Sequence, residues 1–330
     1  MDHPGASAQR PSCWTGSPNA QGSEAVERNP KTRVKSAIKA GIRRVVRHLP
    51  WGVEQAILDA IVAHRGGFRI IGQLFPSNIT GTLYANGDYG LIQSVADDWL
   101  ILPIYANHKT WAKSVCRVFA EFFQERGGGT YLDIGANIGL TTIPIARNNQ
   151  VSCHSFEPDP DLFAHLYENI RRNCGGNVEL HQLALGAENA EVSFSINTRG
   201  NRGNNRIAEK GALKVRVARL DDLCLDCPEP LAAKIDTEGF EPFVLQGGWR
   251  VLGKADLVAI EFHPHQIRTA GGDPDRVIEF LAGFRQLAVL PGESDQKPIY
   301  ERTETICSHL RDYAADIRDE IKYLDVIGRR

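Results

Sequence analysis

Four acidic residues of this chain stand where short apolar, strand-like runs end. They are Asp133, Glu157, Asp236 and Glu261. In an open α/β sheet the carboxyl ends of the strands form the ligand crevice, so we expect these four side chains to converge there. A group of carboxylates repels phosphates and favours a ligand that carries a positive charge.

The turn that follows the first of these runs does not have the glycine spacing of a dinucleotide-binding loop. Such a loop reads G-x-G-x-x-G, and its second glycine lets the backbone approach a pyrophosphate. Counted from Gly135 in the stretch YLDIGANIGLT, residues 131–141, the second and third glycine positions hold Asn137 and Leu140. The template fails twice, which argues against a nicotinamide or flavin dinucleotide.

S-adenosylmethionine fits this turn better. Its α-ammonium group can meet the carboxylate of Asp133, while its α-carboxylate binds at a helix N-terminus, where free N–H groups favour an anion. The acid that ends the next strand is placed to accept both ribose hydroxyls. Helix capping and turn chemistry are the alternative roles for the first acid and for the asparagine. We therefore expect a cofactor-binding set of Asp133, Gly135, Asn137, Gly139, Glu157 and Asp236.

Methyl transfer to a hydroxyl group requires a base within hydrogen-bond reach of the acceptor. His263 is our leading candidate because its ordinary pKa is closest to the operating pH, and Asp236 is the second. Glu261 lies two residues before His263 and hence on the same strand face, and Glu238 follows Asp236 closely. In the alternative interpretation Glu238 only favours the N-terminus of the next helix, and His263 is a strand-end histidine.

Metal binding is not predicted, although donors are present. Asp236, Glu238, Glu261, His263 and His265 together offer oxygen and nitrogen ligands, but their spacing matches no metal motif. The pair Cys224 and Cys227 forms a lone C-x-x-C without a second pair, and we interpret the two as ordinary thiols.

From residue 130 onward strand-like and helix-like segments alternate. This order predicts an α/β fold with a doubly wound, Rossmann-like sheet that is mostly parallel and has an antiparallel last strand. Helices are expected at about 138–147, 160–173, 240–247, 274–284 and 303–319, and strands at TYLDI, VSCHSFE, NVELHQLAL, EVSFSI, KVRVARL, LAAKID, LVAIEFH, RQLAVL and KYLDVIG.

The residues before this domain divide into two parts. Residues 1–30 are polar and rich in Pro, Gly and Ser, which predicts a disordered tail. An N-terminal extension is expected over 31–104 and the main domain over 105–330. Within the extension, residues 31–48 form a basic amphipathic helix that either caps the main domain or docks on an anionic membrane surface. Short β-like runs follow it: FRIIGQLF, TGTLYANG and DWLILPIYA.

Composition limits the possible classes of protein. With 330 residues, 42% of them hydrophobic and 24% charged, the chain is typical of a globular protein, and no apolar run approaches the length of a membrane-spanning helix. No secretory signal pattern is seen, and seven scattered cysteines suit a reducing compartment, so a cytoplasmic location is expected, with peripheral membrane contact if residues 31–48 dock there. A nucleic-acid partner is not expected, because the basic stretch has no interleaved aromatic residues.

The chain resembles the FkbM-type methyltransferases, a family of class I S-adenosylmethionine-dependent enzymes. The resemblance rests on LDIGANIG at 132–139, FEPDPDLFAHLYENI at 156–170, LALG at 183–186, RLDDL at 219–223, KIDTEGFE at 234–241 and IEFH at 260–263. It implies that Leu185 contacts the cofactor. It also implies O-methylation of a hydroxyl group on a sugar, a glycolipid or a polyketide-like acceptor, and it does not extend to the first 104 residues.

A glycine- and asparagine-rich loop at 198–206 carries Arg199, Arg202 and Arg206. It is either a lid that clamps an anionic or sugar acceptor or a solvated hairpin connection. Two other functions remain open at this point, a nicotinamide-dependent oxidoreductase on the same fold and a non-catalytic binding module.

Overall fold

The computed structural model describes residues 81–98, 100–196, 202–207, 211, 213–291, 295–316 and 323–330. The expected tail, the expected basic helix, the β-like run FRIIGQLF and residues 198–201 of the arginine-rich loop, including Arg199, lie outside these ranges. In the described ranges no helix is long and apolar enough to cross a membrane.

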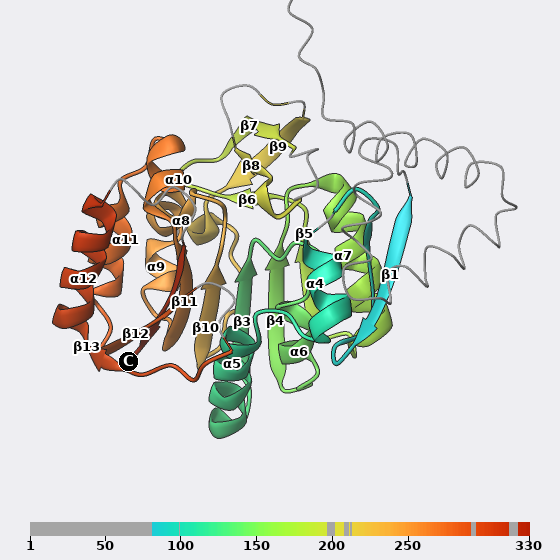
Figure 1. Cartoon of the computed structure of the whole chain (residues 1–330), viewed down its shortest axis with the longest axis horizontal. Helices are drawn as coiled ribbons and strands as arrows, with labels where there is room; N and C mark the ends of the chain where they lie inside the picture. Colours follow the sequence, from blue (N-terminus) through green and yellow to red (C-terminus); the bar gives the residue numbers. More distant parts are fainter. Residues whose placement is uncertain are drawn as a thin grey trace, which may run out of the picture.

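The centre of the molecule is an eight-stranded sheet with the strand order β13-β12-β14-β11-β10-β3-β4-β5 (Figure 1). The parallel part of the sheet consists of β11, β10, β3, β4 and β5, each paired in parallel with the next. Strand β14 is antiparallel to both of its neighbours, β11 and β12. The predicted doubly wound sheet with an antiparallel last strand is thus confirmed. The bounds are β3 (Gly129–Ile134), β4 (Val151–Phe156), β5 (Val178–His181), β10 (Leu231–Ile235), β11 (Leu257–Phe262), β12 (Gln286–Pro291), β13 (Glu301–Arg302) and β14 (Leu324–Arg329).

Helices cover both faces of this sheet because its strands are apolar on both sides. In β3, Leu132 belongs to a core that also contains Val244 and Ile278, whereas its neighbour Tyr131 packs on the opposite face, with its ring centroid 4.9 Å from that of Phe119. The helices are α5 (Lys113–Arg126), α6 (Thr142–Ala146), α7 (Pro160–Asn173), α8 (Glu241–Gly247), α9 (Trp249–Leu252), α10 (Pro264–Thr269), α11 (Pro274–Leu281) and α12 (Thr303–Ala315).

Local capping explains which helix boundaries were predictable. Helix α7 has the predicted bounds, because the Asp159 carboxylate accepts a hydrogen bond from the Asp161 N–H at 2.8 Å and Pro160 occupies the first turn. The helix expected over 138–147 is confined to α6. Gly139, inside the expected range, has a φ of 91°, and Asn137, just before that range, has a φ of 51°. A right-handed helix cannot include such residues, so it begins only after them.

The segment predicted as one strand, NVELHQLAL, forms two strands in different sheets. β5 is an edge strand of the central sheet. β6 (Ala184–Leu185) pairs with β9 in a four-stranded sheet of order β6-β9-β7-β8. This second sheet contains β7 (Ala190–Ser195), β8 (Arg206–Ile207) and β9 (Leu213–Ala218). It lies over the carboxyl ends of the central strands (Figure 1).

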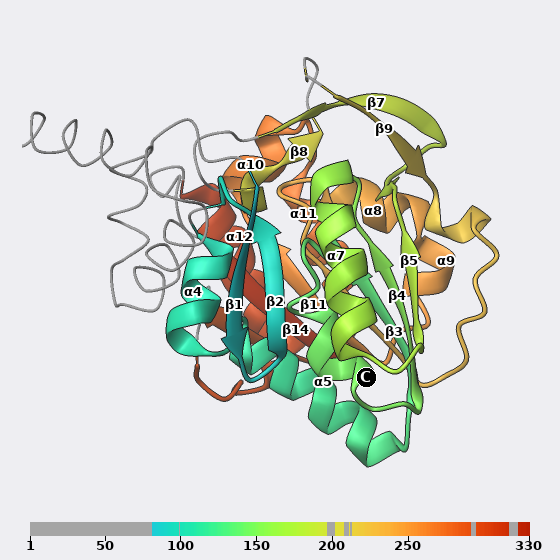
Figure 2. The same ribbon diagram turned by 90° about the vertical axis from the view of Figure 1, so that its right-hand side faces the viewer.

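The described part of the extension consists of a hairpin and a helix beside α7 (Figure 2). The hairpin pairs β1 (Thr82–Gly87) with β2 (Gly90–Val95). The β-like interpretation of DWLILPIYA was wrong, since this run forms α4 (Ile101–His108). The Asp98 carboxylate accepts hydrogen bonds from the N–H groups of Leu100 and Ile101, at 3.0 and 3.2 Å, and so satisfies donors at the start of the helix. The expected domain boundary at residue 104 falls inside this helix.

Candidate active site

A cavity of about 510 Å³ lies at the carboxyl ends of the central strands. It opens where the strand order reverses between β3 and β10, which is the position where α/β sheets bind ligands. The cavity lies between the central sheet and the second sheet. Eight residues expected in the site line its wall: Gly135, Asn137, Glu157, Leu185, Asp236, Glu238, Glu261 and His263.

The turn after β3 is shaped by a glycine. Gly135 has a φ of 84°, and a Cβ added there would lie 1.8 Å from the backbone oxygen of Asp236. A side chain at this position would therefore separate the ends of β3 and β10. Gly139 does not line the cavity; a Cβ there would lie 2.9 Å from the Leu166 side chain, so this glycine lets the turn pack on α7.

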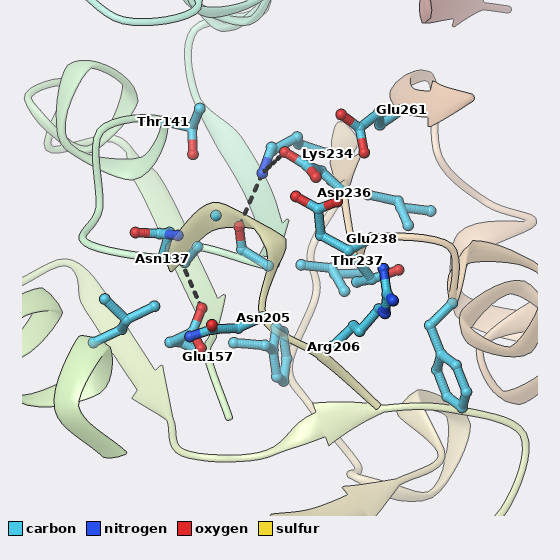
Figure 3. A pocket seen from close by; sticks show the side chains of 18 of the residues that line it. Asn137, Thr141, Glu157, Asn205, Arg206, Lys234, Asp236, Thr237, Glu238 and Glu261 are labelled. Atoms are coloured by element: carbon cyan, nitrogen blue, oxygen red, sulfur yellow. Dashed lines mark hydrogen bonds and ion pairs between the residues drawn. The ribbon is translucent and has the colours of Figure 1, made fainter. Parts of the chain in front are cut away.

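Glu157 is held with its carboxylate at the cavity wall. The backbone N–H groups of Asn137 and Asp159 donate to its two oxygens at 3.0 and 2.8 Å. Only 5% of the residue is exposed, and burial raises the pKa of Glu157 to about 8. Figure 3 shows Glu157 beside Asn137, in the position expected for an acid that accepts ribose hydroxyls.

Asp133 lies behind the cavity wall. It is fully buried, and the hydroxyls of Thr141 and Thr142 donate to its Oδ2 atom at 2.7 and 2.6 Å. Its Oδ1 atom is 3.6 Å from the Nζ atom of Lys234. The structure thus assigns this carboxylate to holding threonines and a lysine beneath the turn, in place of the direct ion pair with a cofactor ammonium that the sequence suggested.

Lys234 is a site residue that the sequence analysis did not single out. Its ammonium donates to the Gly135 carbonyl at 2.9 Å and lies 3.1 Å from Asp236 Oδ2. Burial lowers the pKa of Lys234, but the carboxylates of Asp236 and Asp133 outweigh burial, so the pKa is raised. A lysine in the otherwise apolar run LAAKI was the available signal, because a buried lysine requires a partner.

An acidic cluster occupies the β10 and β11 side of the cavity. Carboxylate oxygens of Asp236, Glu238 and Glu261 all lie within 4.8 Å of one another. Figure 3 shows the three side chains grouped on the side opposite Glu157. Burial, followed by the nearby carboxylates, raises the pKa values of Glu238 and Glu261 well above the ordinary range. The two carboxyl groups are therefore more basic than ordinary glutamates.

Two further observations mark this cluster. Glu238 has a φ of 56°, a left-handed conformation that is costly for a residue with a side chain and is typical of functional sites. The Oε2 atom of Glu261 is buried without a hydrogen-bond partner among the described residues.

His263 lines the same cavity and caps α10. Its Nδ1 atom accepts a hydrogen bond from the Gln266 N–H at 3.5 Å, and the residue is 5% exposed. Burial, followed by the neighbouring His265, lowers the pKa of His263, so the ring is neutral at neutral pH. His265 is exposed and does not line the cavity.

The two described arginines of the glycine-rich loop have different environments. Arg202 makes ion pairs with Asp97, Asp159 and Asp161 at 3.0, 3.5 and 3.3 Å. These contacts join the second sheet to the extension and to α7. Arg206, on β8, is exposed and lines the cavity.

A doubly wound sheet with β14 antiparallel beside β11, and an acidic cavity at the point where the strand order reverses, form the arrangement expected of a Rossmann-like methyltransferase. Residues 133–287 match the family model described as "Methyltransferase FkbM domain". These residues therefore form an FkbM methyltransferase domain, and the enzyme uses S-adenosylmethionine as its methyl donor. The nicotinamide-dependent alternative is thereby set aside.

Two curated proteins are similar in sequence. Hexuronic acid methyltransferase AglP of Haloferax volcanii is 28% identical over 193 residues, which cover 58% of this chain and 74% of that protein. "Methyltransferase 1" of Beauveria bassiana is 29% identical over 141 residues, and the match covers 35% of this chain and 57% of that protein.

Solved structures resemble this chain more distantly. The SAM-dependent methyltransferase from Agrobacterium tumefaciens has a TM-score of 0.40 and 9% identity, with 77% of this chain and 72% of that chain covered. TYW2 of M. jannaschii, solved in complex with AdoMet, has a TM-score of 0.36 and 12% identity, covering 77% of this chain and 89% of that chain.

Proposed function

We propose that this enzyme methylates a hydroxyl oxygen of a sugar, and that the favoured acceptor sugar is a uronic acid. The observation that carries the proposal is the placement of the carboxylates Asp236, Glu238 and Glu261 in the cofactor cavity, opposite Glu157 (Figure 3). An acceptor hydroxyl bound between Glu157 and the three carboxylates would lie close to both the donor methyl group and a proton acceptor.

The residues of the cavity fit S-adenosylmethionine. When bound, this cofactor supplies an electrophilic methyl group and leaves as S-adenosylhomocysteine. Glu157, at the cavity wall, would accept hydrogen bonds from the ribose hydroxyls, and the turn at Gly135 and Asn137 would support the methionine portion. Lys234 fixes this turn relative to Asp236 through its bonds to both.

The Glu238–Glu261 pair removes the proton. An ionised carboxylate of this pair would accept the proton that the acceptor hydroxyl loses on methylation. A carboxylate whose pKa is raised by burial and by neighbouring carboxylates is a stronger base than an ordinary glutamate, which suits a general base. Asp236 instead makes an ion pair with Lys234, with Nζ and Oδ2 3.1 Å apart. Neutral His263 is the second proton acceptor in the same wall.

The preference for a uronic acid rests on Arg206. Of the described cations that line the cavity, Lys234 and Arg202 are held by carboxylates at 3.6 Å or less. The Arg206 side chain is exposed and, although its charge also lowers the pKa of Glu238, its guanidinium can form a two-point contact with a sugar carboxylate. The similarity to a hexuronic acid methyltransferase supports the same class of acceptor.

The test uses the purified full chain, methyl-labelled S-adenosylmethionine and a matched pair of oligosaccharides. One oligosaccharide ends in glucuronic acid and the other in glucose, and mass spectrometry detects the added methyl group. We expect methylation of the uronate, and we expect Arg206→Gln to raise its KM by about 10-fold through loss of a charge-assisted contact. Equal rates for both sugars would refute the uronate preference. Cofactor turnover with an amine but with no hydroxyl acceptor would refute O-methylation.

A further inference from the structure

A second group of metal-ligating side chains lies at the edge of the central sheet. His154 on β4 and Glu179 and His181 on β5 offer ligand atoms within 4.8 Å of one another. The strands are parallel, and His154 is in register with Glu179. Residues two apart on a strand share a face, so His181 lies on the same face as the other two. These three residues do not line the cofactor cavity.

The distances between the ligand atoms of the three side chains match a single coordination sphere. His154 Nδ1 lies 3.3 Å from His181 Nε2 and 3.5 Å from Glu179 Oε2, and His181 Nε2 lies 3.8 Å from Glu179 Oε1. Two ligand atoms that are each about 2.1 Å from one zinc ion, at a tetrahedral angle, lie about 3.4 Å apart. The three side chains therefore have this spacing without a change of rotamer.

The surroundings of the three side chains favour an ion that buried histidines hold on one side and that solvent reaches on the other. The side chains of His154 and His181 are 6% and 13% exposed, whereas that of Glu179 is 64% exposed. The His181 ring is fixed by stacking on Phe156, with ring centroids 4.5 Å apart. Two buried imidazoles and one exposed carboxylate therefore place the group at the protein surface, with the Glu179 side facing solvent.

We propose that His154, Glu179 and His181 bind one zinc ion, with water as the fourth ligand. Imidazole nitrogens and a carboxylate are ligands that suit this ion. The ion would join the last two strands of the sheet. It would also fix Phe156, which stacks on His181 and lines the cofactor cavity. The site is separate from the methyl-transfer chemistry and does not depend on the proposed acceptor.

Zinc binding can be measured directly on the full chain after treatment with a chelator. Zinc sulfate is titrated in competition with a chromogenic chelator. We expect one tightly bound ion per chain, an affinity at least about 100-fold lower in His181→Gln, and a smaller loss in Glu179→Gln, since even outer-shell changes at metal sites cost 10- to 100-fold. Exposed His309→Gln on α12 is the matched control and should leave the affinity unchanged.

Cobalt(II) substitution distinguishes this site from the cysteine pair. Nitrogen and oxygen ligation gives visible d–d bands without a thiolate charge-transfer band, and Cys224→Ser should not alter the spectrum. A charge-transfer band that disappears in Cys224→Ser would assign the metal to Cys224 and Cys227 and overturn the proposal. Equal zinc affinity in the wild type and in Glu179→Gln and His181→Gln would also overturn it. Glu179→Gln alters an exposed side chain, so it keeps the test valid if His181→Gln fails to fold.

Discussion

Burial determines what each acidic side chain of this site does. Asp133 and Glu157 both follow the pattern of a strand-end acid, yet Asp133 is enclosed by two threonines and Lys234, whereas Glu157 reaches the cavity wall. Glu157 keeps capacity for a ligand, because each of its oxygens accepts one backbone hydrogen bond and can accept another. Its function therefore follows from its position at the end of β4.

Glu157→Gln tests this assignment through pH. The pKa of Glu157 is raised from 4.5 to about 8 in the folded protein, so the folded chain holds a proton that the unfolded chain loses. The contribution of Glu157 to the free energy of unfolding is fully present below pH 4.5 and is lost as the pH rises through about 8. Thermal unfolding of the cofactor-free protein should thus show a smaller loss of stability between pH 5 and 8 in Glu157→Gln than in the wild type.

The same variant should bind S-adenosylhomocysteine more weakly. Loss of a charged acceptor for two hydroxyls is expected to reduce affinity by about 10- to 100-fold at pH 9. Calorimetry measures this, with Glu168→Gln on the exposed face of α7 as the control. Affinity that rises with pH equally in the wild type and in Glu157→Gln would show that another group controls cofactor binding.

The proton acceptor is tested by comparing two variants. Glu238→Gln preserves shape and removes the base, so kcat should fall by about 100-fold while cofactor affinity stays within a few-fold. His263→Gln should reduce kcat less, because the buried carboxylates accept the proton. If His263→Gln causes the larger loss and Glu238→Gln is nearly as fast as the wild type, the histidine is the base, as the sequence alone suggested.

At the scale of elements, the second sheet is fixed over the cavity by one buried arginine. Arg202, in the short 3₁₀ turn Arg202–Asn204, is 6% exposed and contacts three aspartates from two other parts of the chain. Asn205 also donates to Asp159 at 2.6 Å. Because Arg206 follows directly, this anchoring also sets where the exposed arginine meets the cavity.

Arg202→Ala should therefore affect both stability and the acceptor. Removing one partner from a buried ion-pair group costs about 3 kcal/mol of unfolding free energy. The KM for the acceptor should increase more than that for the cofactor, since β8 is displaced. Denaturant unfolding and steady-state kinetics measure the two effects. Arg276→Ala, which removes an exposed i,i+3 pair, is the control and should change stability by less than about 0.5 kcal/mol.

At the scale of the whole molecule, a buried asparagine joins the extension to the cofactor turn, which is the turn after β3 at residues 135–139. Asn169 on α7 accepts from the Gln93 N–H at 2.8 Å and donates to the carbonyls of Gln93 and Ile138, both at 2.9 Å. Gln93 lies on β2 and Ile138 lies in the turn after β3. One side chain therefore links three segments that are distant in sequence.

Asn169→Ala should destabilise the protein by about 3 kcal/mol, because three buried hydrogen bonds are lost. It should also weaken cofactor binding, since Ile138 belongs to the cofactor turn. Urea unfolding and calorimetry with S-adenosylhomocysteine measure these effects. A variant that loses stability but binds the cofactor with unchanged affinity would show that the extension acts on folding alone.

Much of the fold was predictable because its signals are local. The cap at Asp159 and the following proline specify the start of α7, and apolar runs that end in acids specify the central strands. The run DWLILPIYA was misassigned because a short apolar segment has no clear period, and only its cap at Asp98 and its packing distinguish helix from strand.

The sequence by itself determined the order of the elements, the strand-end acids and the family, because each depends on residues close together in the chain. The tertiary structure decided which acids face the cavity. Asp133 and Lys234 are in register on β3 and β10, so a lysine from a distant segment and the threonines of the following turn enclose this carboxylate. Such pairing across strands determines desolvation and pKa, and local sequence does not specify it.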